Sequence, residues 1–233
     1  MGRILYGPAH FYIKNKSLGL SPVRLVMVRT PYICICECFC YTTDIMKTVL
    51  PTKDEARALL AEHVSDIYQR FHAEMVGRAV EGYAEKLGED SHLWWLTGYL
   101  HDIDYDLHPT LHPGPSLDWF KLWGYPESLI HAVLAHAIGF NGFTQKPETP
   151  LAHALLACDE ICGIFYAYQK LNPVPWGEIK VSSIKKKFNE PKFAPGISRE
   201  HITSAMAGFD ITLDDHISNL ITFLSALPKP VTK

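Results

Sequence analysis

Histidines and aspartates at the ends of apolar segments are the residues of this sequence that are best suited to chemistry. The segment Leu93–Asp104 reads LWWLTGYLHDID and closes on an adjacent pair, His101 and Asp102. Its apolar residues recur at helical spacing, which predicts a buried helix that ends at this pair. Burying an imidazole or a carboxylate is costly unless it is hydrogen-bonded, paired or bound to a metal. The pair therefore predicts partner residues on other segments.

Similar polar side chains lie on the inward faces of other predicted helices, or in a proline-rich loop after the His-Asp pair. They are His72, Asp159, His136, His112 and His108. Imidazole and carboxylate groups together suit a divalent cation such as Mn, Fe, Co, Ni or Zn, or Mg where carboxylate and water dominate. The sequence therefore predicts a divalent-metal site built from segments that lie far apart along the chain.

The elements that must position these residues are helices. From Pro51 onward, helices are predicted over residues 53–63, 67–87, 93–104, 116–123, 127–137, 150–171, 181–187, 198–208 and 213–227. Strand signals after Met46 are almost absent, and no internal repeat occurs. We therefore predict one all-α domain, a helical bundle, over residues 46–233.

Residues 1–45 have a different character. They mix Gly, Pro, basic residues and short apolar pieces without sustained periodicity, which indicates a weakly ordered N-terminal extension. The stretch ICICECFC contains alternating cysteines at positions Cys34, Cys36, Cys38 and Cys40. On a strand these thiols would share one face but spread along it, whereas structural zinc sites usually use a Cys-x₂₋₄-Cys spacing. We do not expect this cluster to bind metal.

Composition and charge exclude several classes of function. The chain has 233 residues, of which 47% are hydrophobic and 20% charged, as is usual for a soluble globular protein. A net charge of −3 gives no basic field that would favour nucleic acid or an anionic membrane as the main partner. No unbroken apolar run approaches the roughly 18 residues of a membrane span. Without a secretory signal, the six cysteines favour the reducing cytoplasm, and Cys158 and Cys162 are predicted as buried core residues.

The order of the polar residues resembles the HD superfamily of metal-dependent phosphohydrolases. The resemblance begins with His72, continues with the pair His101 and Asp102, and ends with Asp159. The segment LTGYLHDIDYDLHP resembles the GLLHDIDYE-type segment of a bacterial branch of predicted HD hydrolases. Two later segments, ALLACDEICGIF and VSSIKKKFNEPKFAPGISREHI, also resemble that branch. The likeness covers roughly residues 50–227 and implies the HD-type helical bundle.

The resemblance implies a first metal with four ligands, which are His72, His101, Asp102 and Asp159. In relatives with two metals the residue that matches Asp102 bridges them, so His112 and His136 become candidates for a second metal, ahead of His108. The implied activity is hydrolysis of a phosphomonoester or phosphodiester by metal-activated water. His101 and Asp102 would be central to catalysis. The implied substrate is small and phosphorylated, for example a nucleotide.

Several other polar residues have a plainer interpretation. Asp104 and Asp106 follow the His-Asp pair closely, so either could hydrogen-bond to a metal ligand and orient it, but we expect both to be exposed loop carboxylates. Lys185 belongs to a lysine run that is typical of a solvated surface, and is also a candidate contact for the substrate's phosphate. The remaining histidines are expected on the surface or in packing: His63, His92, His131, His153, His201 and His216.

Two other functions are compatible with the same residues. Some proteins of the HD fold use six His and Asp ligands for a di-iron, oxygen-dependent oxidation. Such a set exists here in His72, His101, Asp102, His112, His136 and Asp159. The domain would otherwise be a non-catalytic module that binds a nucleotide or a metal. The sequence leaves the oligomeric state open.

Overall fold

The structure is a computed structural model that describes residues 49–229, and every structural statement below concerns this part of the chain. The predicted extension over residues 1–45, including its cysteine cluster, lies outside the described residues. All regular secondary structure between residues 49 and 229 is helical, without a strand, so the all-α prediction is confirmed.

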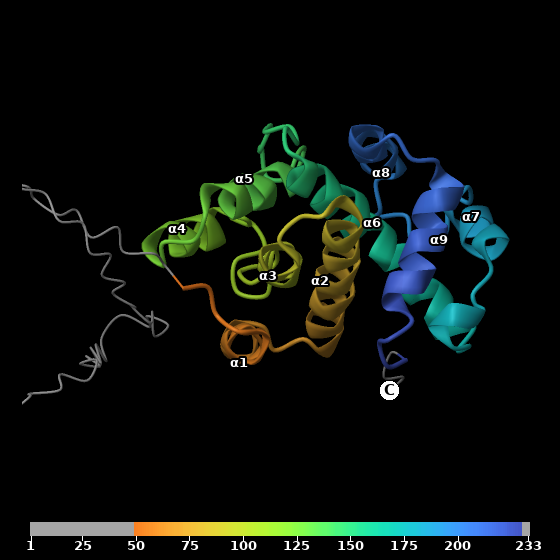
Figure 1. Cartoon of the computed structure of the whole chain (residues 1–233), viewed down its shortest axis with the longest axis horizontal. Coiled ribbons are helices and arrows are strands. Elements are labelled where there is room, and N and C mark those ends of the chain that lie inside the picture. The colour runs from red at the N-terminus through yellow and green to blue at the C-terminus, as the bar shows by residue number, and fades with distance from the viewer. Residues whose placement is uncertain (1–48, 230–233) are drawn as a thin grey trace, which may run out of the picture. The chain divides into compact units, whose positions relative to one another are not determined.

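The helices follow one another along the chain in the order shown in Figure 1. They are α1 (Lys53–His63), α2 (Ile67–Leu87), α3 (Ser91–Leu100), α4 (Gly114–Leu122), α5 (Glu127–His136), α6 (Pro150–Leu171), α7 (Val181–Phe188), α8 (Arg199–Met206) and α9 (Leu213–Leu224). Two short 3₁₀ turns, Trp176–Glu178 and Ala207–Phe209, precede α7 and follow α8.

Capping residues set most of these boundaries where the sequence predicts them. Thr52 and Glu55 form the predicted capping box of α1. Gly88 ends α2 in the left-handed region with φ of 74°, a conformation that glycine adopts without steric cost. The Asp90 carboxylate accepts hydrogen bonds from the first backbone amides of α3. Thr149 caps α6 in the same way.

Several predicted boundaries differ from the structure by one to four residues, and two of the elements concerned adjoin the site. The helix that carries the His-Asp pair ends at Leu100, and the chain then runs through turns to residue 113. α4 begins at Gly114, so Ser116 is not its cap; its hydroxyl instead donates to the carbonyl of Pro113. The earlier start is possible because a proline at the first helical positions lacks only an amide that would have no partner there.

α3 and α2 are the elements that position the site. They approach backbone to backbone, since a Cβ atom added to Gly98 would lie 2.9 Å from the Val76 carbonyl oxygen. Figure 1 shows α3 on one side of α2 and α9 on the other, and α6 passes behind α2 and α9. Fully buried side chains such as Leu96 and Leu100 fill the space around α3. The free thiols of Cys158 and Cys162 on α6 are buried, as predicted.

α6 is long and apolar enough to cross a membrane by length and composition, although the sequence contains no unbroken apolar run of that length. It has 22 residues and a mean hydropathy of 1.2 over its best window, and 61% of that window is buried inside the protein. A single helix that is mostly buried has the character of a core helix. The burial follows from its position between α5, α2 and α8.

Candidate metal centre

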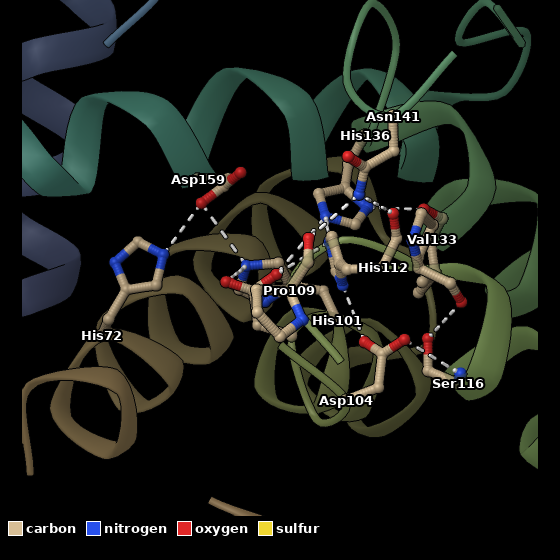
Figure 2. A network of polar contacts seen from close by, with 12 residues as sticks. His72, His101, Asp104, Pro109, His112, Ser116, Val133, His136, Asn141 and Asp159 are labelled. Carbon is tan, nitrogen blue, oxygen red and sulfur yellow. Dashed lines mark hydrogen bonds and ion pairs between the residues drawn. The ribbon is translucent and has the colours of Figure 1, made fainter. Parts of the chain in front are cut away.

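Five separate segments bring the predicted ligands together. His72 comes from α2, Asp159 from α6, and His136 from the last turn of α5. His101 and Asp102 follow the end of α3, while His112 lies in the turn before α4. Figure 2 shows the side chains of the four histidines and of Asp159 gathered from their different helices and turns.

The first group of contacts surrounds Asp159. Its Oδ1 atom lies 2.8 Å from His72 Nε2 and 3.4 Å from His101 Nε2. His101 Nε2 also lies 3.3 Å from Asp102 Oδ2. This arrangement gathers the four residues that the resemblance assigns to the first metal, and three of them (His72, His101 and Asp102) offer ligand atoms within 4.8 Å of one another.

The second group surrounds the other oxygen of Asp102. Asp102 Oδ1 lies 3.2 Å from His112 Nε2 and 3.5 Å from His136 Nε2. The two imidazole Nε2 atoms are 3.1 Å apart. Asp102 thus directs one carboxylate oxygen toward each group, which is the position that a bridging carboxylate occupies. His108 lies outside both groups, with its ring 6.1 Å from that of Trp119.

Hydrogen bonds at Nδ1 fix the orientation of three of the imidazoles. His101 Nδ1 donates to the Gly98 carbonyl at 2.8 Å, and His136 Nδ1 donates to the Val133 carbonyl. His112 Nδ1 donates to Asp104 Oδ1 at 2.7 Å. Because a neutral imidazole carries one proton, each of these rings presents an Nε2 lone pair to the cluster.

These lone pairs fit a cation. The Nε2 atoms of His112 and His136 face each other without a proton to share, which is repulsive unless a positive charge lies with them. His101 Nε2 is buried and makes no hydrogen bond. Orienting a ligand histidine through its second nitrogen is the usual arrangement at metal sites. The residues present therefore fit a bound divalent metal.

The electrostatics of the cluster agree with this fit. Burial lowers the pKa of His101, but the carboxylates of Asp102 and Asp159 outweigh burial and hold that pKa well above its usual value. Without a cation His101 therefore keeps a second proton, which a bound metal would displace to use the Nε2 lone pair. Burial raises the pKa of Asp102, while His101, His136 and His112 hold it well below its usual range. The same holds for Asp159 beside His101 and His72. The site retains two ionised carboxylates and attracts positive charge.

Asp104 corrects one of the sequence predictions. It is not an exposed loop carboxylate but is completely buried. Oδ1 accepts the hydrogen bond from His112, and Oδ2 accepts one from the Ser116 amide at 3.1 Å (Figure 2). The sequence left a supporting role open for Asp104 and Asp106 alike but favoured exposure, and it did not show which histidine such a carboxylate would orient.

The other polar residues near the motif have different partners. Asp106 is partly exposed and accepts hydrogen bonds from the Ser65 amide and hydroxyl at 2.7 and 2.8 Å, ahead of α2. Lys185, on α7, pairs with Asp214 at 2.9 Å, and its contact with phosphate stays a prediction. Glu160, next to Asp159, accepts a hydrogen bond from the Ser198 amide. Burial and the Asp159 charge raise the pKa of Glu160 to about 7.

Comparison with known families agrees with this geometry. Residues 71–163 match the HD domain family, and this range spans every residue of the cluster from His72 to Asp159. The chain contains an HD domain. HD domains are all-helical and are typically found in metal-dependent phosphohydrolases. No curated protein and no solved structure matches the chain.

Proposed function

We propose that this HD domain is a metal-dependent phosphohydrolase that cleaves phosphate esters of small molecules. The observation that carries the proposal is the position of Asp102 between two sets of ligand atoms. One oxygen faces His101, and the other faces the close pair His112 and His136. Two cations joined by one carboxylate are a common arrangement in enzymes that hydrolyse phosphate esters.

The residues of the chain hold and orient the ligands. When bound, divalent cations lower the pKa of coordinated water and offset the charge of the phosphoryl oxygens. Three histidines donate hydrogen bonds through Nδ1 to the carbonyls of Gly98 and Val133 and to the carboxylate of Asp104. The Nε2 atoms of these histidines therefore stay available as ligands. The carboxylates of Asp102 and Asp159 would repel an anionic substrate by themselves. Phosphate therefore enters this cluster only together with cations.

A di-iron, oxygen-dependent oxidation is the second candidate. It is supported by the size of the ligand set, because all six residues of the predicted shell gather in one cluster. These residues are His72, His101, Asp102, His112, His136 and Asp159. A third outcome is a domain that binds metal and nucleotide without turnover.

Metal content and phosphate release test the proposal together. The full chain, Asp102→Ala and the control Asp106→Asn are purified in parallel and analysed for bound metals. Each is then assayed for phosphate release from a panel of phosphomonoesters and phosphodiesters with Mn, Co, Ni, Zn or Mg. We expect one or two equivalents of metal and phosphate release in the wild type and in Asp106→Asn, with both lost in Asp102→Ala.

Other results would contradict the proposal in distinct ways. Two irons with substrate-dependent oxygen uptake would favour the oxidation. Metal and nucleotide binding without phosphate release would favour the non-catalytic module. A protein that takes up neither these metals nor iron would contradict both the hydrolysis and the oxidation, and would leave only a module that binds a nucleotide without metal.

A further inference from the structure

An exposed aromatic ring lies directly beside the candidate metal centre. Phe140, in the loop between α5 and α6, is 42% exposed. Its ring centroid lies 6.0 Å from that of His112 and 6.3 Å from that of Tyr105. Tyr105, which is partly buried, packs edge-on against His112 with centroids 5.3 Å apart. One imidazole of the cluster is therefore flanked by two aromatic side chains.

The loop that carries Phe140 is held in a fixed conformation. Its residues 139, 141 and 142 all have φ between 46° and 83°, the left-handed region. Asn141, one of the few non-glycine types that adopts this region readily, donates through its side-chain amide to the carbonyls of Pro109 and His112 at 3.0 and 2.9 Å (Figure 2). The Gly139 amide closes the loop on the Phe143 carbonyl at 2.8 Å.

This construction has a consequence for ligand binding. Single exposed apolar side chains are common, and Phe140 differs from the others in its position: Asn141 fastens its loop to the turn that contains His112 and leaves a large part of the ring uncovered beside that histidine. Because the Phe140 ring lies 6.0 Å from the His112 ring, a phosphate ester bound at His112 and His136 would bring its organic part near Phe140 if that part points toward the α5–α6 loop. Aromatic rings stack favourably on such a surface in offset or edge-to-face geometry.

We propose that Phe140, with Tyr105 beside it, recognises a planar aromatic ring in the organic part of the substrate. This inference rests on the proposed function, because it takes the phosphate to lie at the His112–His136 group. The ring belongs to a nucleobase or to a simple aryl group, which share the same stacking chemistry. Asn141 is a positioning residue that holds Phe140 in place.

Binding of two matched phosphonates tests the proposal without any requirement for turnover. Benzylphosphonate and cyclohexylmethylphosphonate share the anionic group and similar size, but only the first contains an aromatic ring. Affinities are measured by calorimetry on the Mn-loaded full chain, for the wild type, Phe140→Leu, Phe140→Trp and the control Leu122→Ala. Leu122 is an exposed apolar residue of α4, so its truncation removes surface apolar area elsewhere.

We expect the wild type, Phe140→Trp and Leu122→Ala to bind benzylphosphonate about threefold to tenfold more tightly than the cyclohexyl compound. Phe140→Leu should lose this preference while keeping its Mn content and its affinity for the cyclohexyl compound. An equal preference in the wild type and Phe140→Leu would overturn the inference. Failure of the wild type to bind either phosphonate would also overturn it.

Two further arms separate the related conclusions. Adenosine 5′-monophosphate and ribose 5-phosphate, compared in the same way, show whether a nucleobase gains more from Phe140 than a benzyl group does. Phosphate release from benzyl phosphate and cyclohexylmethyl phosphate is measured separately. A Phe140-dependent binding preference without phosphate release leaves this inference standing and contradicts the proposed hydrolysis. Phosphate release without a Phe140-dependent ring preference supports the proposed hydrolysis and contradicts this inference.

Discussion

At the scale of single residues, the candidate centre depends on which nitrogen of each histidine carries a proton. Backbone carbonyls orient His101 and His136, so substitution cannot remove their acceptors directly. His112 differs because its acceptor is a side chain, Asp104. Asp104 therefore offers a way to disturb the orientation of one ligand without removing any ligand atom.

Asp104→Asn is expected to weaken the second cation selectively. An asparagine in this position can accept from His112 or from the Ser116 amide, but its NH₂ group then opposes the other donor. Loss of such a carboxylate partner typically lowers metal affinity by about 10- to 100-fold. Titration with Mn or Co, followed by calorimetry, should show a weakened second equivalent and a first equivalent close to that of the wild type.

Asp106→Asn is the matched control, two residues further along the same turn. Its carboxylate bonds to Ser65 and Asp66 and to none of the predicted ligands. It should lower thermal stability slightly and leave both metal affinities unchanged. Equal metal affinities in the Asp104 and Asp106 variants would contradict the role given to Asp104.

His216 makes a separate, pH-dependent contribution to stability. It is completely buried, with Nδ1 accepting a hydrogen bond from the Tyr83 hydroxyl and Nε2 donating to the Ala157 carbonyl at 3.1 Å. Burial lowers the pKa of His216 from 6.5 to about 4. Because the folded-state pKa is the lower one, the contribution is complete above about pH 6.5 and is lost as the pH falls toward 4.

We therefore compare the urea unfolding of the wild type and His216→Asn at several pH values. At about pH 8 the variant should be less stable, because it loses buried hydrogen bonds. Between about pH 8 and pH 4.5 the wild type should lose roughly 2.5 kcal/mol that the variant does not lose. The gap between the two proteins should therefore narrow on acidification. A gap that stays constant would show that His216 does not titrate in this range.

At the scale of elements, the close approach of α2 and α3 sets the position of the His-Asp pair. A Cβ atom on Gly98 would lie 2.9 Å from the Val76 carbonyl oxygen and 3.0 Å from the Gly77 Cα atom. Both neighbours are backbone atoms of α2, so only a movement of α2 or α3 away from the other helix can relieve the contact. The Gly98 carbonyl also accepts a hydrogen bond from His101 Nδ1, and this bond links the helix packing to the site.

Gly98→Ala is expected to reduce stability and metal binding together. Overpacking of this kind typically costs about 1–3 kcal/mol, which corresponds to a fall in Tm of roughly 2–10 °C for a protein of this size. The displaced His101 should also bind the first cation more weakly. Differential scanning calorimetry and metal analysis measure the two effects.

Gly114→Ala provides the comparison for this prediction. A Cβ atom at Gly114 meets nothing within 4 Å, so the free energy of unfolding should change by less than about 0.5 kcal/mol. Metal content should also equal that of the wild type. If Gly114→Ala weakened metal binding as much as Gly98→Ala, the α2–α3 contact would not explain the weaker metal binding of Gly98→Ala.

At the scale of the whole molecule, the sequence is informative where local signals are strong. α1, α2 and α6 have the predicted bounds because Thr52, Gly88 and Thr149 act as local caps. The all-α fold and the gathering of the His and Asp residues follow from apolar periodicity and from the likeness to a known family. These features depend on residues that are close together along the chain or on a motif of fixed order.

The turn between α3 and α4 depends instead on tertiary contacts. Asp104 is buried because His112 and Ser116 fold back onto it. Asn141 acts through carbonyl groups about 30 residues away along the chain. Neither partner can be identified from neighbouring residues, and a polar residue in a turn is otherwise expected to be exposed. The details around the site were therefore missed even though its main residues were predicted.

The boundary of the folded domain gives the last prediction. Leu50 packs against the core, and the Pro51 carbonyl accepts a hydrogen bond from His92 Nε2 at 2.9 Å. Thr52 then caps α1, and Lys53 pairs with Glu81 of α2 at 2.6 Å. These contacts make residues 50–53 part of the folded domain, and a domain start near Met46 stays a prediction.

A chain shortened to begin at Met46 should therefore keep its Tm and its metal content, because it retains all of these contacts. A chain that begins at Ala56 loses the Thr52 cap and the Lys53–Glu81 pair. Loss of a cap alone costs about 0.5–2 kcal/mol, so its Tm should fall by several degrees, by roughly 2–4 °C per kcal/mol. If the Met46 chain is insoluble or lacks metal while the full chain binds it, residues 1–45 are part of the folded unit and the proposed boundary is wrong.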